Sequence, residues 1–304
     1  MPRRTLLPAA LAVVASLFIC SNAAAQQAPA GPPVADRPAV TPPVATQPPA
    51  QLDQILVNLP TTLSLKRHKS YFRITHRFAR DLRRGSFGEL AEDFFSLDNG
   101  AIIGLEYRYG ITSRTQAGIH RSILGKTIDL FGRWDAIAQD ETRPIGLSFR
   151  GGVEGQNNLR LDPQVGVSAT VSHVAGRIAV YATPTFVNDA HTPTLQAVHD
   201  DHSHGGDEEG AEEIPGEDKD DTAFVGLGTR LRVLDTMSVV FEVSPRIYGY
   251  RPDRAAWNVG VEKLTRGHVL QLNFGNNFST TPGMLARGGS SHDVYMGFNM
   301  SRKW

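Results

Sequence analysis

Strict alternation of apolar and polar residues is the feature that most constrains the fold of this chain. After about Thr61, runs such as AIIGLEYRYG at 101–110 place apolar side chains at every second position, with polar or charged ones between them. A period of two is typical of a β-strand with two different faces, whereas a helix repeats about every 3.6 residues. About twelve such runs follow one another toward the C-terminus, so we expect an all-β domain.

The length of the runs and of their connectors predicts where this domain lies. Most runs extend over about 9 to 12 residues, compared with about 5 to 6 in globular strands and about 9 to 11 in strands that cross a bilayer at a tilt. Short turns such as VAG at 174–176 alternate with longer connectors such as 80–100 and 279–292. Turns on one side and loops on the other are typical of a single transmembrane antiparallel β-barrel, which leaves no unpaired strand edge in lipid.

The N-terminal 60 residues have a different composition. Arg3 and Arg4 precede the apolar stretch LLPAALAVVASLFIC, and NAAAQQ supplies a small-residue cleavage site, so residues 1–25 are predicted to be a signal peptide. The only cysteine, Cys20, lies inside it, which excludes disulfides and cysteine-based metal sites from the exported chain. We expect residues 26–60, rich in proline, to be a disordered linker, and residues 61–304 to form the barrel.

One connector stands out by its charge. Residues 188–221 contain twelve Asp and Glu against Lys219 alone, a local charge of −11 in a chain of formal net charge +0. His199, His202 and His204 lie among these acids, and this mixture predicts weak binding of a divalent metal. The glycines and like charges favour instead a solvated loop without fixed geometry. We expect no other cofactor.

The charged side chains of the strands should line the lumen, because the apolar face of each strand turns toward lipid. The predicted lumen-lining residues are Arg73, Arg77, Glu106, Arg108, Asp129, Arg133, Asp135, Arg150, Arg230, Glu242 and Glu262. They fit a narrow pore with an arginine ladder that conducts anionic solutes. They fit equally well a set of ion pairs that brace and fill a lumen, and a barrel of about twelve strands has a size that does not decide between the two.

Three stretches resemble a known family. YFRITHRFARDL (71–82), LAEDFFSLDNGAIIGLEYRYGIT (90–112) and QAGIHRS (116–122) are similar to uncharacterised bacterial β-barrel proteins grouped under a domain-of-unknown-function label. The resemblance spans most of the domain and implies a barrel in the Gram-negative envelope, without catalytic residues. The alternating C-terminal YMGFNMSRKW also resembles the signal read by the barrel-assembly machinery, which we expect as a partner beside outer-membrane lipid.

These patterns predict an outer-membrane β-barrel that serves as a narrow passive pore or an envelope scaffold, with a small solute as a candidate partner. A soluble periplasmic barrel of the lipocalin type, binding a small apolar ligand, would alternate in the same way with its apolar face inside. An outer-membrane lipase would use an outward histidine such as His76 or His173. The sequence contains no G-x-S-x-G, H-E-x-x-H, P-loop or dinucleotide motif, so we expect no enzyme. It also has no basic patch with interleaved aromatics, so we expect no nucleic-acid binding.

Overall fold

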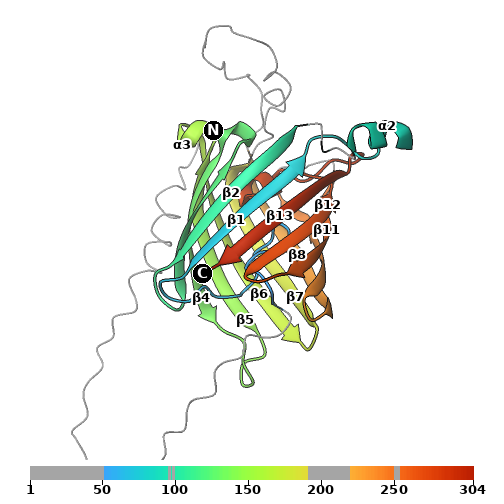
Figure 1. Ribbon diagram of the computed structural model, residues 1–304. Helices are drawn as coiled ribbons and strands as arrows, with labels where there is room; N and C mark the ends of the chain where they lie inside the picture. Colours follow the sequence, from blue (N-terminus) through green and yellow to red (C-terminus); the bar gives the residue numbers. More distant parts are fainter. Residues whose placement is uncertain (1–50, 95–96, 98–99, 191–219, 250–253) are drawn as a thin grey trace, which may run out of the picture. The chain divides into compact units, whose positions relative to one another are not determined.

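The alternating runs form antiparallel strands of one sheet that curls into a barrel (Figure 1). The computed structural model describes residues 51–304 except 95–96, 98–99, 191–219 and 250–253, all within one compact unit of the chain. The strands are β1 (Ser70–Phe78), β2 (Ala101–Gly110), β3 (Thr115–Ser122), β4 (Ile128–Ile137), β5 (Gly146–Gly155), β6 (Leu161–Ala175), β7 (Ile178–Ala190), β8 (Asp220–Leu234), β9 (Met237–Ser244), β10 (Arg246–Tyr248), β11 (Ala256–Leu264), β12 (His268–Gly275) and β13 (Tyr295–Lys303).

Closure of the barrel is made by the first and last strands. Apart from the short β10, each strand pairs with the strands before and after it, so that β9 pairs with β11. The strand β1 pairs with β13 over the register Tyr71↔Lys303 to Arg77↔Gly297. The short strand β10 pairs with β8 beyond Pro245 and prolongs the β9 side, so the wall is a closed barrel of 12 strands. This closed barrel confirms the fold class predicted from the sequence. In lipid, only such closure leaves no backbone N–H or C=O group of a strand edge unpaired.

The connectors separate into two sets (Figure 1). Two-residue turns join β6 to β7 and β8 to β9 at one end, called the turn end here, and the longest connectors lie at the other, the loop end. The β4–β5 connector, residues 138–145, is the exception at the turn end. The helices α2 (Phe87–Glu92), η2 (Leu124–Lys126), α3 (Gln156–Leu159) and α5 (Pro282–Ala286) all belong to loop-end connectors. Among the described residues, no helix is long and apolar enough to cross a membrane.

Local polar contacts fix the shapes of individual connectors. The side chain of Ser86 caps the backbone N–H of Glu89, whose carboxylate returns a bond to the Ser86 N–H, so α2 begins with a capping box. In the β4–β5 turn, Asp140 accepts hydrogen bonds from the Arg143 and Thr142 side chains and from both backbone N–H groups. These contacts, Arg143 first, hold the pKa of Asp140 well below its usual value.

The two faces of the wall differ as the alternation predicts. In β2, Leu105 and Tyr107 are 44% and 41% exposed, while Glu106 and Arg108, which alternate with them, are 5% and 3% exposed. The same contrast recurs in the other strands, with isoleucine, leucine, valine and phenylalanine outside and polar side chains inside. A lipocalin-type barrel has the reverse arrangement, so the outward apolar belt contradicts the soluble alternative.

Two predicted boundaries differ from the structure. Strands β7 and β8 extend to Ala190 and from Asp220, so only residues 191–219 of the acidic connector remain between them, outside the described part of the chain. Residues 51–60, assigned to the disordered linker, are instead mostly buried. Their apolar side chains and main-chain hydrogen bonds give them a fixed place inside the barrel. The predicted signal peptide and residues 26–50 lie outside the described residues.

The outward face generates a direct prediction. Replacing Leu105, at the middle of β2, by arginine places a charge against hydrocarbon and should lower the free energy of unfolding by about 2–4 kcal/mol. Urea unfolding of the protein in phospholipid vesicles measures this change. The matched control Leu105→Met keeps volume and polarity and should cost well under half as much; equal costs for the two variants would show that lipid does not contact this face.

Candidate functional site: a lumen filled from both ends

The lumen holds the chain's own residues 51–65, called the lumen segment here (blue trace in Figure 1). At its centre is a hairpin-like turn, in which the Leu56 N–H donates to the Leu59 carbonyl at 2.8 Å and the Thr61 N–H to the Gln54 carbonyl at 2.8 Å. Leu56, Val57 and Leu59 are at most 1% exposed. The segment is therefore a packed insertion and not a strand of the wall.

Glu242 on β9 binds the tip of this turn. Its carboxylate accepts hydrogen bonds from three successive backbone N–H groups, those of Val57 at 3.1 Å, Asn58 at 2.9 Å and Leu59 at 3.0 Å. The Asn258 side chain donates a further bond at 3.0 Å. Converging main-chain N–H groups form a concave anion site, and a carboxylate fills it with charge-assisted bonds. The buried charge of Glu242 is thus matched by the dipoles of the lumen segment.

Donors on the wall bind the main-chain carbonyls of the same segment. Arg73 donates to the Val57 carbonyl, and Arg230 reaches the carbonyls of Asp53 and Ile55 at 3.3 and 3.0 Å. Further donors are Gln271 to Leu56 at 2.9 Å, Lys303 to Leu52 at 3.0 Å and Arg133 to Leu63 at 3.2 Å. These contacts recognise backbone, so the wall supplies the bonds that an irregular segment at membrane depth requires.

All eleven residues predicted to line the lumen lie on its inner side, and they serve two purposes. Eight form ion pairs within the wall: Arg108 with Glu106, Arg133 with Asp135, Arg150 with Asp129, and Arg230 with Glu262. The other three, Arg73, Arg77 and Glu242, bind the lumen segment, with Arg77 donating to the Asn58 side chain at 3.1 Å. The charges therefore brace and fill the lumen, in the manner of the second sequence-based interpretation.

The β12–β13 loop, residues 276–294, fills the lumen from the loop end. Glu154 on β5 accepts hydrogen bonds from the Thr281 hydroxyl at 3.0 Å and from the Gly283 N–H at 2.9 Å, at the start of α5. His120 on β3 lies 3.0 Å from the Thr280 hydroxyl. Leu285 and Ala286 join Leu56, Val57 and Leu59 in one apolar cluster. The two fillings therefore meet inside the barrel.

Little space remains where the two fillings meet. The cavity between the lumen segment, the β12–β13 loop and the wall measures about 40 Å³. A cavity holds a water molecule when about 10–15 Å³ is open to a water-sized sphere, so this one has room for a few waters. In this conformation the cavity is too small for an organic solute.

Two wall glycines make room for the leucines of the turn. A Cβ atom at Gly226 on β8 would overlap Leu59 Cδ2, and one at Gly228 would overlap Leu56 Cδ1. Glycine inside a strand costs stability but permits such close approach. The alternation of β8 identifies both as inward positions, yet nothing in the sequence indicates what approaches them.

Sequence reasoning missed the lumen segment itself. The sequence did contain a signal, because its composition changes after the proline-rich stretch. Five of the residues 51–60 are large and apolar, more than a solvated linker normally contains: Leu52, Ile55, Leu56, Val57 and Leu59. Because these apolar residues do not alternate strictly with polar ones, the pattern did not predict that they belong to the β-barrel.

The histidines have separate fates. His199, His202 and His204 lie outside the described residues, so metal binding there stays a prediction; within the described residues, no cluster of three or more His, Cys, Asp or Glu has the arrangement of a metal site. His76 stacks on the Phe298 ring at 4.9 Å, and His173 Nδ1 lies 2.7 Å from the Pro144 carbonyl oxygen.

Comparison with known families then identifies the fold. Residues 53–304 match the family described as membrane bound beta barrel domain (DUF5777). The chain belongs to this family. The match begins within the lumen segment, so the family domain contains most of the filling as well as the wall. A membrane-bound antiparallel barrel with an even number of strands is of the outer-membrane type, and the protein is accordingly an outer-membrane β-barrel.

Solved structures with a similar arrangement of strands are distant. A NanC porin is 8% identical with a TM-score of 0.48, over 77% of this chain and 100% of that one. The Acinetobacter baumannii outer membrane protein Omp33 is 9% identical with a TM-score of 0.39, over 80% and 100%. Outer membrane phospholipase A from Escherichia coli is 8% identical with a TM-score of 0.38, over 77% and 90%. No curated protein matches the sequence. At these levels of similarity no function is transferred.

The two buried glutamates predict separable effects. Glu242→Gln removes the charge that binds three N–H groups, so amide hydrogen exchange of residues 53–61 should accelerate at least tenfold, equivalent to about 1.4 kcal/mol or more. Mass spectrometry of the deuterated peptides measures this, with the barrel strands as internal reference.

Glu154→Gln is the matched control, because that side chain holds only the β12–β13 loop in the same lumen. It should accelerate exchange in residues 280–286 and leave residues 53–61 unchanged. If both variants loosen the same peptides, the two fillings are one unit and Glu242 has no special role.

Proposed function

We propose that this protein is a gated passive pore of the outer membrane, closed by its lumen segment and opened when that segment withdraws toward the turn end. The observation that supports this most is the recognition of the segment through its backbone. Glu242, Arg73 and Arg230 bind main-chain groups. A hydrogen bond to a charged group contributes about 1.5–3 kcal/mol net, because water replaces it on both partners when the lumen is hydrated, so withdrawal has a finite cost.

The polar inner wall also favours a pore. Beyond the ion-paired residues, the inner face presents Ser148, Thr170, Thr183, Asn258 and Asn273, all buried. If the segment left, water would solvate these side chains, whereas an apolar wall would resist wetting. Acids and arginines alternate around the lumen, so we expect weak selectivity, with small polar or anionic solutes as the passing class.

An envelope scaffold is the second candidate. The apolar cluster that runs from Leu56 and Leu59 through Phe224 to Leu285 favours a permanently filled lumen. Withdrawal of the segment exposes these side chains to water at about 25 cal/mol per Å² of apolar surface. Conductance is the measurement that separates a pore from a scaffold.

The proposal assigns no catalytic activity. Thr280, His120 and Glu106 form a row of hydroxyl, imidazole and carboxylate, but 3.9 Å separates His120 Nδ1 from Glu106 Oε2, beyond hydrogen-bond distance. The outward histidines contact an aromatic ring and a backbone carbonyl, as described above.

Conductance in planar bilayers tests the gate. Filling the space beside the turn with Gly226→Val and Gly228→Val together should displace Leu56 and Leu59 and raise the open probability at least tenfold over the native chain, which should be mostly closed. Gly166→Val is the control, since a Cβ at Gly166 meets Pro282 and Val187 only at ordinary distances of 3.6 and 3.8 Å.

Hydrogen exchange of residues 53–61 on the same samples shows whether the segment has left. A displaced segment without added conductance would refute the pore and leave the scaffold. An undisplaced segment with added conductance would show that solute passes by another route.

A further inference from the structure

The outer wall carries a group of exposed aromatic side chains at the turn end. Tyr107 and Tyr109 lie on β2, and Trp304 follows β13. The backbone of Trp304 bonds to that of Ser70, which lies opposite Tyr109 in the β1–β2 register. Tyrosine and tryptophan on the outside of a barrel gather where hydrocarbon meets water. These aromatic residues therefore mark the membrane interface at the turn end.

Two basic side chains lie at the same level of the wall. Phe72 on β1 lies opposite Tyr107 on one side and opposite Arg302 of β13 on the other. Arg302 in turn lies opposite His268 on β12. Tyr107, Phe72, Arg302 and His268 thus form one row across four neighbouring strands, so both bases lie at the membrane interface.

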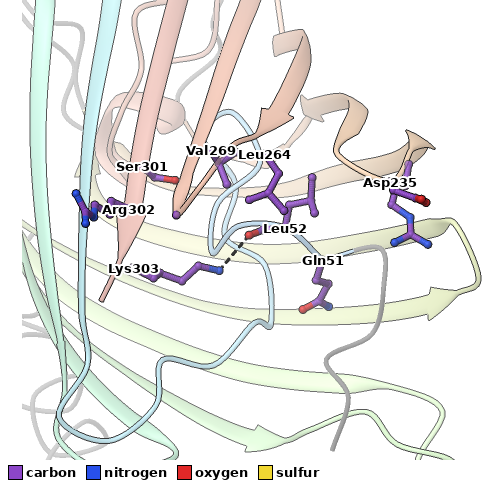
Figure 2. Close-up of a pocket in the computed structure, with 10 residues that line it drawn as sticks. Gln51, Leu52, Asp235, Leu264, Val269, Ser301, Arg302 and Lys303 are labelled. Atoms are coloured by element: carbon purple, nitrogen blue, oxygen red, sulfur yellow. Dashed lines mark hydrogen bonds between the residues drawn. The ribbon is translucent and has the colours of Figure 1, made fainter.

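The neighbours of Arg302 on β13 face inward. Ser301 donates to the Asp53 carboxylate at 2.6 Å, and Lys303 donates to the Leu52 carbonyl at 3.0 Å. Arg302 contributes to the border of the turn-end cavity drawn in Figure 2, but its side chain lies on the opposite side of the strand from Lys303, away from the lumen segment. The alternation of β13 therefore turns Arg302 toward the membrane.

These bases have no anionic partner. Among the described residues, the side chains of Arg302 and His268 form no hydrogen bond and no ion pair. The strands β1, β11, β12 and β13 contain a single acidic residue, Glu262, which is buried and paired inside the barrel. Lys263 on β11 is exposed on the outer face and adds a third base, with its Nζ 3.0 Å from the Thr236 hydroxyl. The outer face therefore has an excess of positive charge here.

The next row toward the middle of the membrane is apolar. Met300 on β13 lies opposite Ile74 on β1 and Leu270 on β12. An acyl chain can follow these side chains while its phosphate stays level with Arg302 and His268. Residues directly opposite each other in antiparallel strands have Cβ atoms about 4.5–5.5 Å apart, so the guanidinium and the imidazole can both reach one phosphate.

We propose that Lys263, His268 and Arg302 form a site for an anionic glycerophospholipid of the leaflet at the turn end. The phosphate accepts hydrogen bonds from the Arg302 guanidinium and from an imidazole N–H of His268, and Lys263 adds attraction at longer range. A headgroup that carries its own ammonium is repelled by the same bases. The site therefore prefers phosphatidylglycerol to phosphatidylethanolamine, whether or not the lumen opens.

Fluorescence of Trp304 in vesicles tests this preference. The chain has three tryptophans, so Trp134→Phe with Trp257→Phe leaves Trp304, beside the site, as the only emitter. The vesicles contain both lipids in equal amounts, with bromine on the acyl chains of one or the other as the quencher. We expect quenching to show a preference of about fivefold for phosphatidylglycerol, the effect of about one basic residue at an anionic surface. Equal quenching by the two lipids would overturn the proposal.

Substitutions in the same chain locate the site. Arg302→Gln removes one charge and should bring the preference close to equality, whereas Arg302→Lys should retain most of it. His268→Phe keeps a ring but removes the N–H, and should reduce the preference about threefold. The matched control is Arg114→Gln, which removes the same charge from the exposed β2–β3 turn at the same end and should change nothing. An equal loss with Arg114→Gln would show a diffuse attraction to the turn end and refute the site.

Glycerol phosphate distinguishes a lipid from a soluble anion, because it has the phosphate without the acyl chains. Added to the same vesicles at millimolar concentration, it should leave the quenching by brominated phosphatidylglycerol unchanged. Displacement of the lipid by glycerol phosphate would show that the bases select a soluble anion and would refute the lipid site. None of these measurements involves conductance, so their outcome is independent of the proposed pore.

Discussion

Main-chain hydrogen bonding in a place without bulk water is the constraint on which this structure depends. It acts on the wall, where closure between β1 and β13 leaves no edge exposed to lipid. It acts again inside, where the irregular lumen segment brings unpaired N–H and C=O groups to membrane depth. Glu242 accepts the N–H groups and Arg73, Arg230 and Gln271 supply donors to the carbonyls. Wall and filling are therefore two parts of one hydrogen-bonded system.

The roles of the charged side chains inside the barrel follow from this hydrogen-bonded system. An arginine inside a barrel can line a path for anions, pair with an acid, or bind a carbonyl, and each use leaves the same residue type at the same inward position. Arg230 combines two of them, since it pairs with Glu262 and also reaches the Asp53 and Ile55 carbonyls. A buried ion pair alone is weak evidence of stability. Its value here is that the pairs orient donors toward the segment.

The sequence predicted the wall well and its filling poorly, for a physical reason. The alternation of faces along a strand is a local property, so a few neighbouring residues suffice to assign Glu106 and Leu105 to opposite faces. The lengths of the turns then predict the orientation of the barrel in the membrane. The lumen segment has no period, and its place depends on contacts such as Asn58 with Glu242, 184 residues away in sequence. The amino-acid composition of residues 51–60 indicated only that the proline-rich stretch had ended. The role of the inward glycines of β8 also could not be predicted from the sequence, because it depends on the positions of Leu56 and Leu59 beside them.

At its start, the lumen segment contacts both strands of the seam that closes the barrel. Asp53 is bound by Tyr71 of β1 and by Ser301 of β13, and Lys303, also on β13, holds Leu52. These contacts from β1 and β13 can all form only when the two strands are paired. The start of the lumen segment is therefore held in place by the same closure that completes the wall.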